Sequence, residues 1–325
     1  MTKEESVYFF QNQILNSDIF NVRHYLKALG VNDITLIHEY KSKYGAIEEE
    51  YFEEWLEALL PYFKTNKSVE SLKLSTQNEL YLEKKSDLNY GLNYLEESKE
   101  NWAGEPKILS AFLGCLKGIN DYSLMQSHLN KIFPMICQVL DDYRADFKLT
   151  GIHLMTELLR IIPSEVVNRF NLNRVIYESL KVNISFESDE LVSESIDLWI
   201  GLIEKVEEFA GKEFLKRSDE LLLLICRDVV ITSKINRKVL FLKSIGKVTE
   251  LMQYTSIRYL RKIVTTLCEA VREDFTNNSV VEAGEESIII VIKNCWIRMK
   301  DEELINMVRR TFGGNEKIEN LLKLI

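Results

Sequence analysis

Apolar residues between positions 132 and 162 repeat every three or four residues, on both sides of a short polar turn. Before the turn, the repeat is carried by Ile132, Phe133, Ile136, Val139 and Leu140. After the turn, it restarts with Phe147, Ile152, Met155, Leu158, Leu159 and Ile162. This spacing places apolar side chains on one face of an α-helix. Pro163 cannot continue the second helix, because proline lacks an amide donor and clashes with the preceding turn. The segment therefore predicts two antiparallel helices.

Segments with the same period fill most of the remaining chain. They span about 127–141, 145–162, 171–184, 188–209, 213–231, 234–249, 255–274, 280–299 and 301–325. Only 4 prolines and 13 glycines occur in 325 residues, so few positions interrupt long helices. Neighbouring segments pair into units of about 40 residues, which is the length of HEAT or armadillo repeats. We therefore expect an all-α solenoid of HEAT- or armadillo-like helical hairpins, stabilised by stacking of their apolar faces.

Two short stretches need separate treatment within this pattern. Residues Ile288–Ile292 are five consecutive β-branched residues, a composition that favours strands over helices. Because their flanks lack the turn residues that bound a strand, we predict a fully buried helix there. The pair Gly313 and Gly314 predicts a helix break.

Composition shifts divide the chain into three predicted regions. Residues 1–63 contain amphipathic segments, including an acidic one near residues 48–60, and are expected to form N-terminal helical hairpins. Residues 64–86 are polar and poor in large apolar side chains, so they predict a linker or mobile loop. Residues 87–325 are expected to form the HEAT-like helical-repeat domain.

The N-terminus, the cysteines and the apolar runs predict an intracellular protein. Thr2 and Glu5 form a capping-box pattern that is typical of a helix start and unlike a secretion signal. The five cysteines are widely separated and lack a CxxC pair, which indicates reduced thiols. The longest uninterrupted apolar run, Leu221–Cys226, is far too short to cross a bilayer. We expect a cytoplasmic and nuclear location.

Charge is unevenly distributed along the chain, whose formal net charge is −9. Residues 1–100 carry a net −7, residues 101–200 a net −4, and the remainder a net +2. Within the last part, residues 234–262 hold eight basic residues against the single acid Glu250. The candidate partner-binding residues of this basic stretch are Lys234, Arg237, Lys238, Arg258, Arg261 and Lys262.

The basic stretch has three possible roles. It can be a solvated face without a partner, an anchor for an acidic partner protein, or a site for nucleic acid or anionic lipid. In the second helix of the stretch, Arg258, Arg261 and Lys262 lie off the predicted apolar face, so we expect an exposed basic surface. Only Tyr254 and Tyr259 are interleaved with the basic residues, which is a thin stacking platform for single-stranded nucleic acid. Nucleic-acid binding is therefore the alternative rather than the primary hypothesis.

The sequence contains no motif that predicts catalysis. Its four histidines are not spaced as metal ligands with each other or with a cysteine. No phosphate-binding loop, dinucleotide-binding glycine motif or nucleophile elbow occurs. Asp141 and Asp142 are adjacent at a helix end, so we expect one to cap the following helix and the other to pair with Lys148 or an arginine. We predict no enzyme activity, cofactor or metal.

The hairpin at residues 132–180 resembles the family of the second Tel-two-interacting protein, the smallest subunit of the Triple-T co-chaperone complex. The resemblance rests on an apolar helix that runs into a Leu-Asp-Asp-Tyr turn, then an aromatic, a lysine, a glycine three residues later, and a proline. The matching residues here are Leu140, Asp141, Asp142, Tyr143, Phe147, Lys148, Gly151 and Pro163, followed by the apolar segment 172–180. The family pattern has a small residue and a glycine where this chain has Phe170 and Asn171.

The resemblance implies a non-catalytic scaffold and a set of partners. These are the Tel-two protein and the first Tel-two-interacting protein. Indirect partners are the phosphatidylinositol-3-kinase-like kinases, whose maturation the complex supports, and the ninety-kilodalton heat-shock chaperone with its adaptor complex. From the residues themselves, Gly151 is expected to be a position of close packing between helices.

Overall fold

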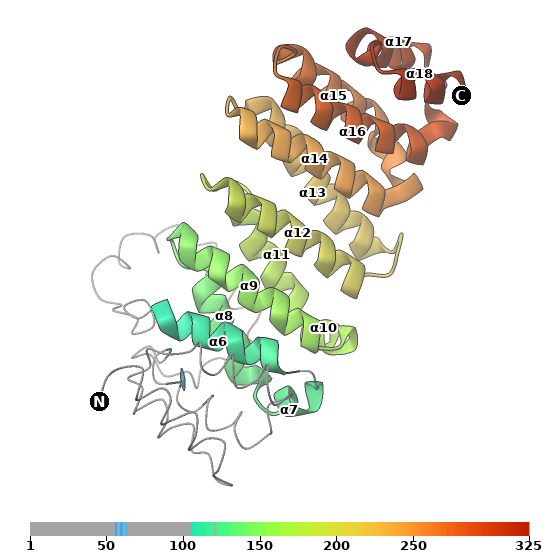
Figure 1. Ribbon diagram of the computed structural model, residues 1–325. Coiled ribbons are helices and arrows are strands. Elements are labelled where there is room, and N and C mark those ends of the chain that lie inside the picture. Colours follow the sequence, from blue (N-terminus) through green and yellow to red (C-terminus); the bar gives the residue numbers. More distant parts are fainter. Residues whose placement is uncertain (1–55, 57–58, 61–62, 64–105, 120, 325) are drawn as a thin grey trace, which may run out of the picture. The chain divides into compact units, whose positions relative to one another are not determined.

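The computed structural model describes residues 56, 59, 60, 63, 106–119 and 121–324. In chain order its helices are α6 (Pro106–Gly118), α7 (Tyr122–Gln126), α8 (Leu129–Leu140), α9 (Ala145–Ile161), α10 (Ser164–Arg169), α11 (Leu172–Asn183), α12 (Asp189–Val206), α13 (Lys212–Ile231), α14 (Ile235–Met252), η4 (Gln253–Tyr259), α15 (Leu260–Glu273), α16 (Asn278–Cys295), η5 (Trp296–Arg298), α17 (Glu302–Phe312) and α18 (Glu316–Lys323). Within these residues every regular element is helical, which confirms the predicted all-α class (Figure 1).

The chain divides into two compact units. The first comprises residues 1–142 and 153–163, and the second comprises residues 143–152 and 164–325. Both predicted region boundaries, at 63/64 and 86/87, lie outside the described residues and stay predictions. No helix of the described part is long and apolar enough to cross a membrane.

In the first unit, helices α6, α8 and the second half of α9 bury their apolar faces. Phe112, Ile132 and Ile136 are completely buried. Arg160 of α9 donates hydrogen bonds to the carbonyl oxygens of Leu116 and Ile119, at 3.2 and 2.9 Å. Because the last carbonyls of a helix have no partner within the helix, these bonds cap the end of α6.

The second unit is a two-layer array of antiparallel helices. Helices α12, α14 and α16 pack side by side in one layer, and α13, α15 and α17 pack side by side in the other (Figure 1). Each helix also packs against its sequence neighbour in the opposite layer, as α13 does on α14 and α15 on α16. This is the helical-hairpin repeat that the sequence predicts.

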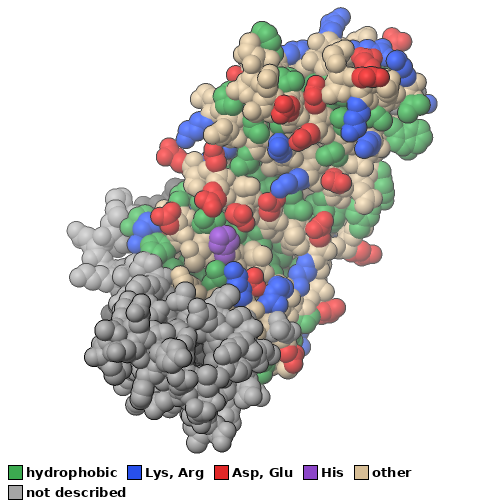
Figure 2. All heavy atoms as spheres, viewed as in Figure 1, with side chains coloured by type: hydrophobic (Ala, Val, Ile, Leu, Met, Phe, Trp, Pro, Cys, Tyr) green, Lys and Arg blue, Asp and Glu red, His purple; other side chains and the backbone are tan. Residues whose placement is uncertain are grey.

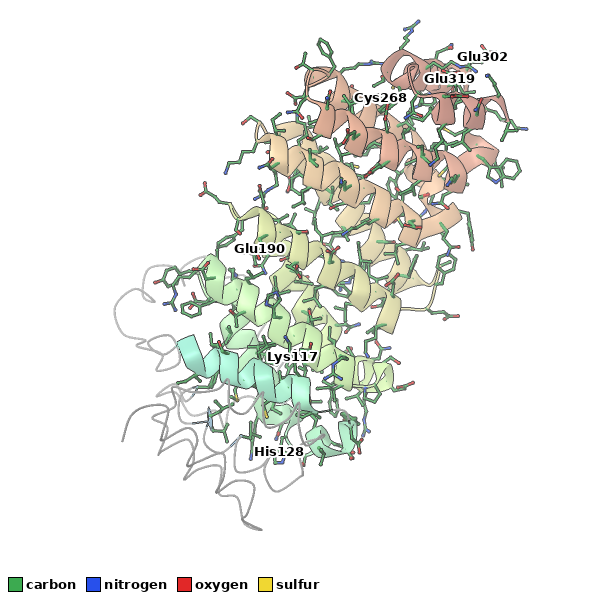
Figure 3. The ribbon with its side chains drawn as sticks, in the orientation of Figure 1. Lys117, His128, Glu190, Cys268, Glu302 and Glu319 are labelled. Carbon is green, nitrogen blue, oxygen red and sulfur yellow. The ribbon has the colours of Figure 1, made fainter. Side chains whose placement is uncertain are left out.

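Helix starts in this unit are specified by polar caps and acidic first turns. The side chain of Ser188 accepts a hydrogen bond from the backbone N–H of Leu191, and Asp301 accepts one from Glu303. Glu190 and Glu302 occupy the first turns of α12 and α17 (Figure 3). Acidic side chains at these positions interact favourably with the partial positive charge of a helix N-terminus.

Three non-glycine residues between helices of the second unit have positive φ angles. Asn171, Ala210 and Gln253 have positive φ angles of 51°, 59° and 48°. The latter two are next to Phe209 and Tyr254, whose rings contact each other with centroids 5.7 Å apart. The turns differ in conformation, because ψ is 33° at Asn171 and −132° at Gln253.

The structure also corrects several local predictions. Residues Ile288–Ile292 lie within α16, so the helix is confirmed, but full burial is wrong because Ile289 and Ile290 are only half-buried. The predicted break at Gly313 and Gly314 is confirmed, because α17 ends at Phe312 and α18 begins at Glu316. Helix α10, directly after Pro163, was not predicted.

Candidate partner-binding groove

Two of the six candidate residues of the basic stretch, Arg237 and Lys238, are buried. The guanidinium of Arg237 pairs with Asp189 and donates hydrogen bonds to the carbonyl oxygens of Phe186 and Glu187, at 2.8 and 2.7 Å. Its side chain is only 8% exposed. These contacts connect α14 to the turn between α11 and α12. Arg237 is therefore a buried residue of the fold, and its role in partner binding stays a prediction.

Lys238 is also buried, and its contacts are with α15 instead of α12. Its ammonium group pairs with Glu273 and Asp274, which follow each other at the end of α15. Burial alone lowers the pKa of Lys238, but its hydrogen bonds to Asp274 and Glu273 and their negative charges raise the pKa above the usual value. Lys238 therefore stabilises the packing of α14 on α15 and is not available to a partner.

The other four predicted residues lie at the surface. Lys234 is exposed at the start of α14, away from the rest. The guanidinium of Arg258 makes two hydrogen bonds to the carboxylate of Asp219, at 2.9 and 2.8 Å. Arg261 is 59% exposed and pairs with Asp301 and Glu303. Of the residues that the structure describes, none places a carboxylate within ion-pair distance of Lys262.

Arg258, Arg261 and Lys262 share an open groove between α13 and α15, with a volume of about 730 Å³. One wall is the last turns of α13, with Cys226, Arg227, Val230 and Ile231. The other wall is η4 and α15, with Arg258, Tyr259, Arg261, Lys262, Thr265, Thr266 and Glu269. The lining therefore contains four basic side chains and one acidic side chain.

The groove has a polar end and an apolar end. At the polar end, Arg258 pairs with Asp219 of α13. Lys262 lies near Cys226, and its positive charge acts to lower the pKa of the Cys226 thiol. Val230 and Ile231, at the end of α13, are 50% and 73% exposed. Large apolar side chains exposed this far beside a basic rim are typical of a protein-binding surface.

Two ionisable groups in the groove have shifted pKa values. Burial raises the pKa of the Cys226 thiol to about 11, although the charge of Lys262 and a hydrogen bond with Thr266 act in the opposite direction. Burial also raises the pKa of Tyr259, together with a hydrogen bond to Asp219. Both groups are therefore neutral at physiological pH, and the charged side chains of the groove are its three arginines, Lys262 and Glu269.

Arg227 is the groove residue that sequence reasoning missed. It lies outside the basic stretch 234–262, on the preceding helix of the same layer. Its guanidinium is 55% exposed and pairs with the adjacent Asp228. Neighbouring helices of one layer are about 40 residues apart in sequence. Arg227 could therefore have been found by looking for a basic residue about one repeat before Lys262.

Outside the groove, acidic and basic side chains are interspersed. Figure 2 shows the face of the array that carries α12, α14 and α16, with both signs mixed over its described part. Exposed pairs such as Lys247 with Asp197 and Lys243 with Glu286 bridge neighbouring helices of this layer. Among the described residues, no group of histidine, cysteine, aspartate and glutamate side chains could hold a metal ion. The five cysteines are buried single thiols, and Cys268 lies within α15 (Figure 3).

The Leu-Asp-Asp-Tyr turn connects α8 to α9. Leu140 is the last residue of α8 and is completely buried. The backbone N–H groups of Asp141 and Asp142 donate to the carbonyls of Cys137 and Val139, at 2.9 and 3.3 Å, and close the helix end. The side-chain roles expected for the two aspartates stay predictions.

Tyr143 lies exposed after this turn, whereas Lys148 and Gly151 of α9 are buried and Phe147 is half-buried. The Tyr143 side chain is 75% exposed, and the Arg144 guanidinium lies over its ring and that of Phe147. Lys148 is only 5% exposed, with its ammonium 5.3 Å from the ring centroid of Phe186. Gly151 is buried, as a close-packing position requires.

The departure from the family pattern at Phe170 and Asn171 has a simple physical explanation. Asn171 has φ and ψ angles of 51° and 33°, which is the left-handed helical region. Glycine adopts this conformation without steric cost, and asparagine tolerates it better than most residues. Asn171 therefore supports the same turn that a glycine supports in the family pattern.

Comparison with known proteins agrees with the motif. The model of the Tti2 family matches residues 34–278. Human TELO2-interacting protein 2 is 19% identical over 170 residues, which cover 51% of this chain and 33% of that protein. The rat protein of the same name is 29% identical over 83 residues, which cover 26% of this chain and 16% of that protein. The chain thus spans about a third or less of the length of these curated relatives.

Solved structures support the fold. The karyopherin Kap121p, in a crystal structure with the extreme C-terminus of the protein phosphatase Cdc14p, superposes with a TM-score of 0.52 at 12% identity. The alignment covers 90% of this chain and 30% of the karyopherin. A crystal structure of Kap121p bound to Pho4p gives the same values. At this identity the likeness concerns the helical-repeat fold alone. Because the family model covers well over half of the chain, and the motif at residues 140–151 lies inside the match, this chain belongs to the Tti2 family.

Proposed function

We propose that this chain is a non-catalytic scaffold subunit of a Triple-T-like co-chaperone complex that supports the maturation and stability of phosphatidylinositol-3-kinase-like kinases. The observation that carries the proposal is the match of the Tti2 family model to residues 34–278. The name of the curated relatives, TELO2-interacting protein 2, supports a protein partner of the Tel-two type. A helical-repeat array suits this role because it offers a long surface for protein contacts.

The proposed direct partners are the Tel-two protein and the first Tel-two-interacting protein. The kinases and the ninety-kilodalton heat-shock chaperone with its adaptor complex are indirect partners, and the complex acts in the cytoplasm and the nucleus. The α13–α15 groove supports a role in protein binding, because it combines exposed aliphatic side chains with a basic rim. Such a rim steers acidic surfaces toward the groove, and desolvated apolar contacts then lengthen the lifetime of the complex.

The groove chemistry also suits binding better than catalysis. Arginine and lysine side chains stay charged at neutral pH and do not exchange protons with a substrate there. The raised pKa of Cys226, about 11, keeps its thiol protonated and poorly nucleophilic. The nucleic-acid alternative loses support, because Arg237 and Lys238 are neutralised by Asp189, Glu273 and Asp274 inside the fold.

The experiment that tests the proposal is affinity purification of the tagged full chain from cells, with mass-spectrometric identification of the proteins that copurify. We expect a Tel-two protein, a first Tel-two-interacting protein and at least one phosphatidylinositol-3-kinase-like kinase. A clean purification that recovers the chain without any of these proteins contradicts the proposal.

Lys262→Glu is the variant for the same experiment, because Lys262 can be reversed without breaking an ion pair of the fold. Lys293→Glu is its matched control, since Lys293 is an exposed lysine on α16 outside the groove, and no described residue places a carboxylate within ion-pair distance of it. We expect Lys262→Glu alone to lower partner recovery. Equal recovery with both variants removes the groove from the proposed interface but leaves the family role in place.

A further inference from the structure

The occupant of the α13–α15 groove can be inferred from the arrangement of its charges. We propose that the groove binds an acidic amphipathic helix of a partner protein. The acidic side chains of this helix contact Arg258, Arg261 and Lys262, and its apolar side chains pack against Val230 and Ile231. This inference rests on the proposed scaffold function and names the kind of segment that the scaffold recognises.

The basic residues lie where a helix normally carries acidic residues. Helix α15 begins at Leu260, and its first turn contains Arg261 and Lys262 but no acidic side chain. Because the N-terminus of a helix carries a partial positive charge, cations there are unfavourable for the stability of the helix. An acidic ligand at this position interacts favourably with both the side chains and the helix dipole.

Internal ion pairs orient the two arginines without using all their donors. The Arg258 guanidinium donates to the Thr255 carbonyl at 3.0 Å and twice to Asp219. A guanidinium has five N–H donors, so two of those on Arg258 remain for a ligand. Arg261 uses its two terminal nitrogens on Glu303 and Asp301, at 2.9 and 2.8 Å, while its side chain stays 59% exposed. A partner carboxylate can therefore join these pairs without first breaking them.

The wall on α13 supplies the apolar part of the site. Val230 and Ile231 line this wall and are 50% and 73% exposed. The exposed aliphatic side chains lie at the opposite end of the groove from Arg258.

The dimensions suit a short helix. The α15 wall extends from Arg258 to Glu269, which is about 17 Å at 1.5 Å per residue. A partner helix of about three turns spans this length. Its acidic side chains must be grouped toward one end and its large apolar side chains toward the other, because the groove separates the two kinds of contact in this way.

The test uses the full chain and a synthetic helical peptide of about twelve residues, labelled with a fluorophore. Glutamates occupy one end and face of the peptide, and leucine and phenylalanine occupy the other. Because either helix direction can satisfy the contacts, the peptide is made in both residue orders. Binding is followed by fluorescence anisotropy. We expect at least one order to bind, and the affinity to fall steeply between about 50 and 500 mM salt, because salt screens exposed charges.

Two substitutions and two matched controls assign the binding to the groove. Lys262→Glu is expected to weaken binding by about tenfold, because it places a like charge against the acidic end. Ile231→Ser is expected to weaken it by about threefold or more through lost apolar contact. Lys293→Glu and Val182→Ser change exposed residues outside the groove and are expected to bind like the parent. Circular dichroism confirms that each variant is folded.

Several outcomes overturn the inference. These are no binding in either order, equal binding of a peptide with glutamine in place of glutamate, or equal weakening by the groove and control substitutions. Displacement of the peptide by a single-stranded oligonucleotide at equal concentration shows a nucleic-acid site instead. If the chain copurifies with its proposed partners but does not bind the peptide, only this inference fails. If the peptide binds and the partners are absent, only the proposed function fails.

Discussion

Replacement of Arg237 by alanine is the sharpest test of whether this buried residue of the basic stretch serves the fold or a partner. The sequence places Arg237 at a partner-binding surface, whereas the structure buries it at the junction of α14 with the turn before α12. A surface role predicts a stable variant with weaker partner binding. The buried role predicts a variant that loses stability even when the chain is alone.

The expected loss follows from the contacts of the guanidinium. Alanine removes the hydrogen bonds to the carbonyl oxygens of Phe186 and Glu187, at 2.8 and 2.7 Å, and the ion pair with Asp189. The Asp189 side chain is 38% exposed, so water compensates part of the ion pair and we discount that contribution. Two charge-assisted bonds to part-buried carbonyls, together with the lost packing of the stem, give about 2–4 kcal/mol.

Urea unfolding followed by far-ultraviolet circular dichroism measures this loss. The midpoint of the transition of the second unit is expected to fall by about 1 M. Lys243→Ala is the matched control, because the Lys243–Glu286 pair is exposed on both sides with atoms 3.6 Å apart. That control is expected to change stability by about 0.5 kcal/mol or less. The reasoning is refuted if Arg237→Ala unfolds together with the control.

Three further predictions concern packing, reactivity and pH. Gly284→Ala is expected to destabilise the fold by about 1–3 kcal/mol relative to Gly201→Ala. The new Cβ at position 284 would lie 2.4 Å from Val271 Cγ2, whereas a Cβ at position 201 would have nothing within 4 Å. Thermal unfolding of the two variants measures the difference, and equal melting temperatures contradict the prediction. Because the pKa of Cys226 is raised to about 11, this thiol is expected to react with a maleimide at neutral pH only after unfolding, as read by peptide mass spectrometry; rapid labelling of the native chain contradicts the burial. The pKa of Lys238 is raised in the fold, so its ion pairs stabilise the fold while the lysine is protonated, and this contribution disappears as pH rises through the raised pKa. The stability difference between parent and Lys238→Met is therefore expected to persist to about pH 10 and to shrink above it. A difference that is constant to about pH 12 argues against the ion pair.

The fold class could be predicted from sequence because it depends on local periodicity. The apolar stripes that define α8 and α9 can be seen within about eleven residues, and the breaks at Pro163 and Gly313 depend on the backbone chemistry of those residues alone. Helix α10 was missed because it has only six residues, which is too few to establish a helical period. The burial of Ile288–Ile292 was overestimated because a uniform apolar run does not show which side of a helix faces the solvent.

The candidate site could be predicted only in part, because its charges are neutralised over long distances. Arg237 meets Asp189 and Lys238 meets Asp274, across 48 and 36 residues of sequence. Nothing within a local window distinguishes these residues from Lys262, which remains exposed. The groove itself requires α13 and α15 to lie side by side, so Arg227 joins it only once the repeat register is known.

Hydroxyl-radical footprinting of the chain, alone and in the complex with the Tel-two protein and the first Tel-two-interacting protein, tests the central claim most directly. The claim is that this helical-repeat subunit binds its partner through the α13–α15 groove. Ile231 is 73% exposed in the groove wall, and Leu324 is a comparably exposed aliphatic reference far from it in sequence, at 82%. The account predicts that complex formation reduces oxidation of Ile231 and Val230 and leaves Leu324 unchanged. A stable complex in which Ile231 and Val230 are oxidised as fast as in the free chain contradicts it.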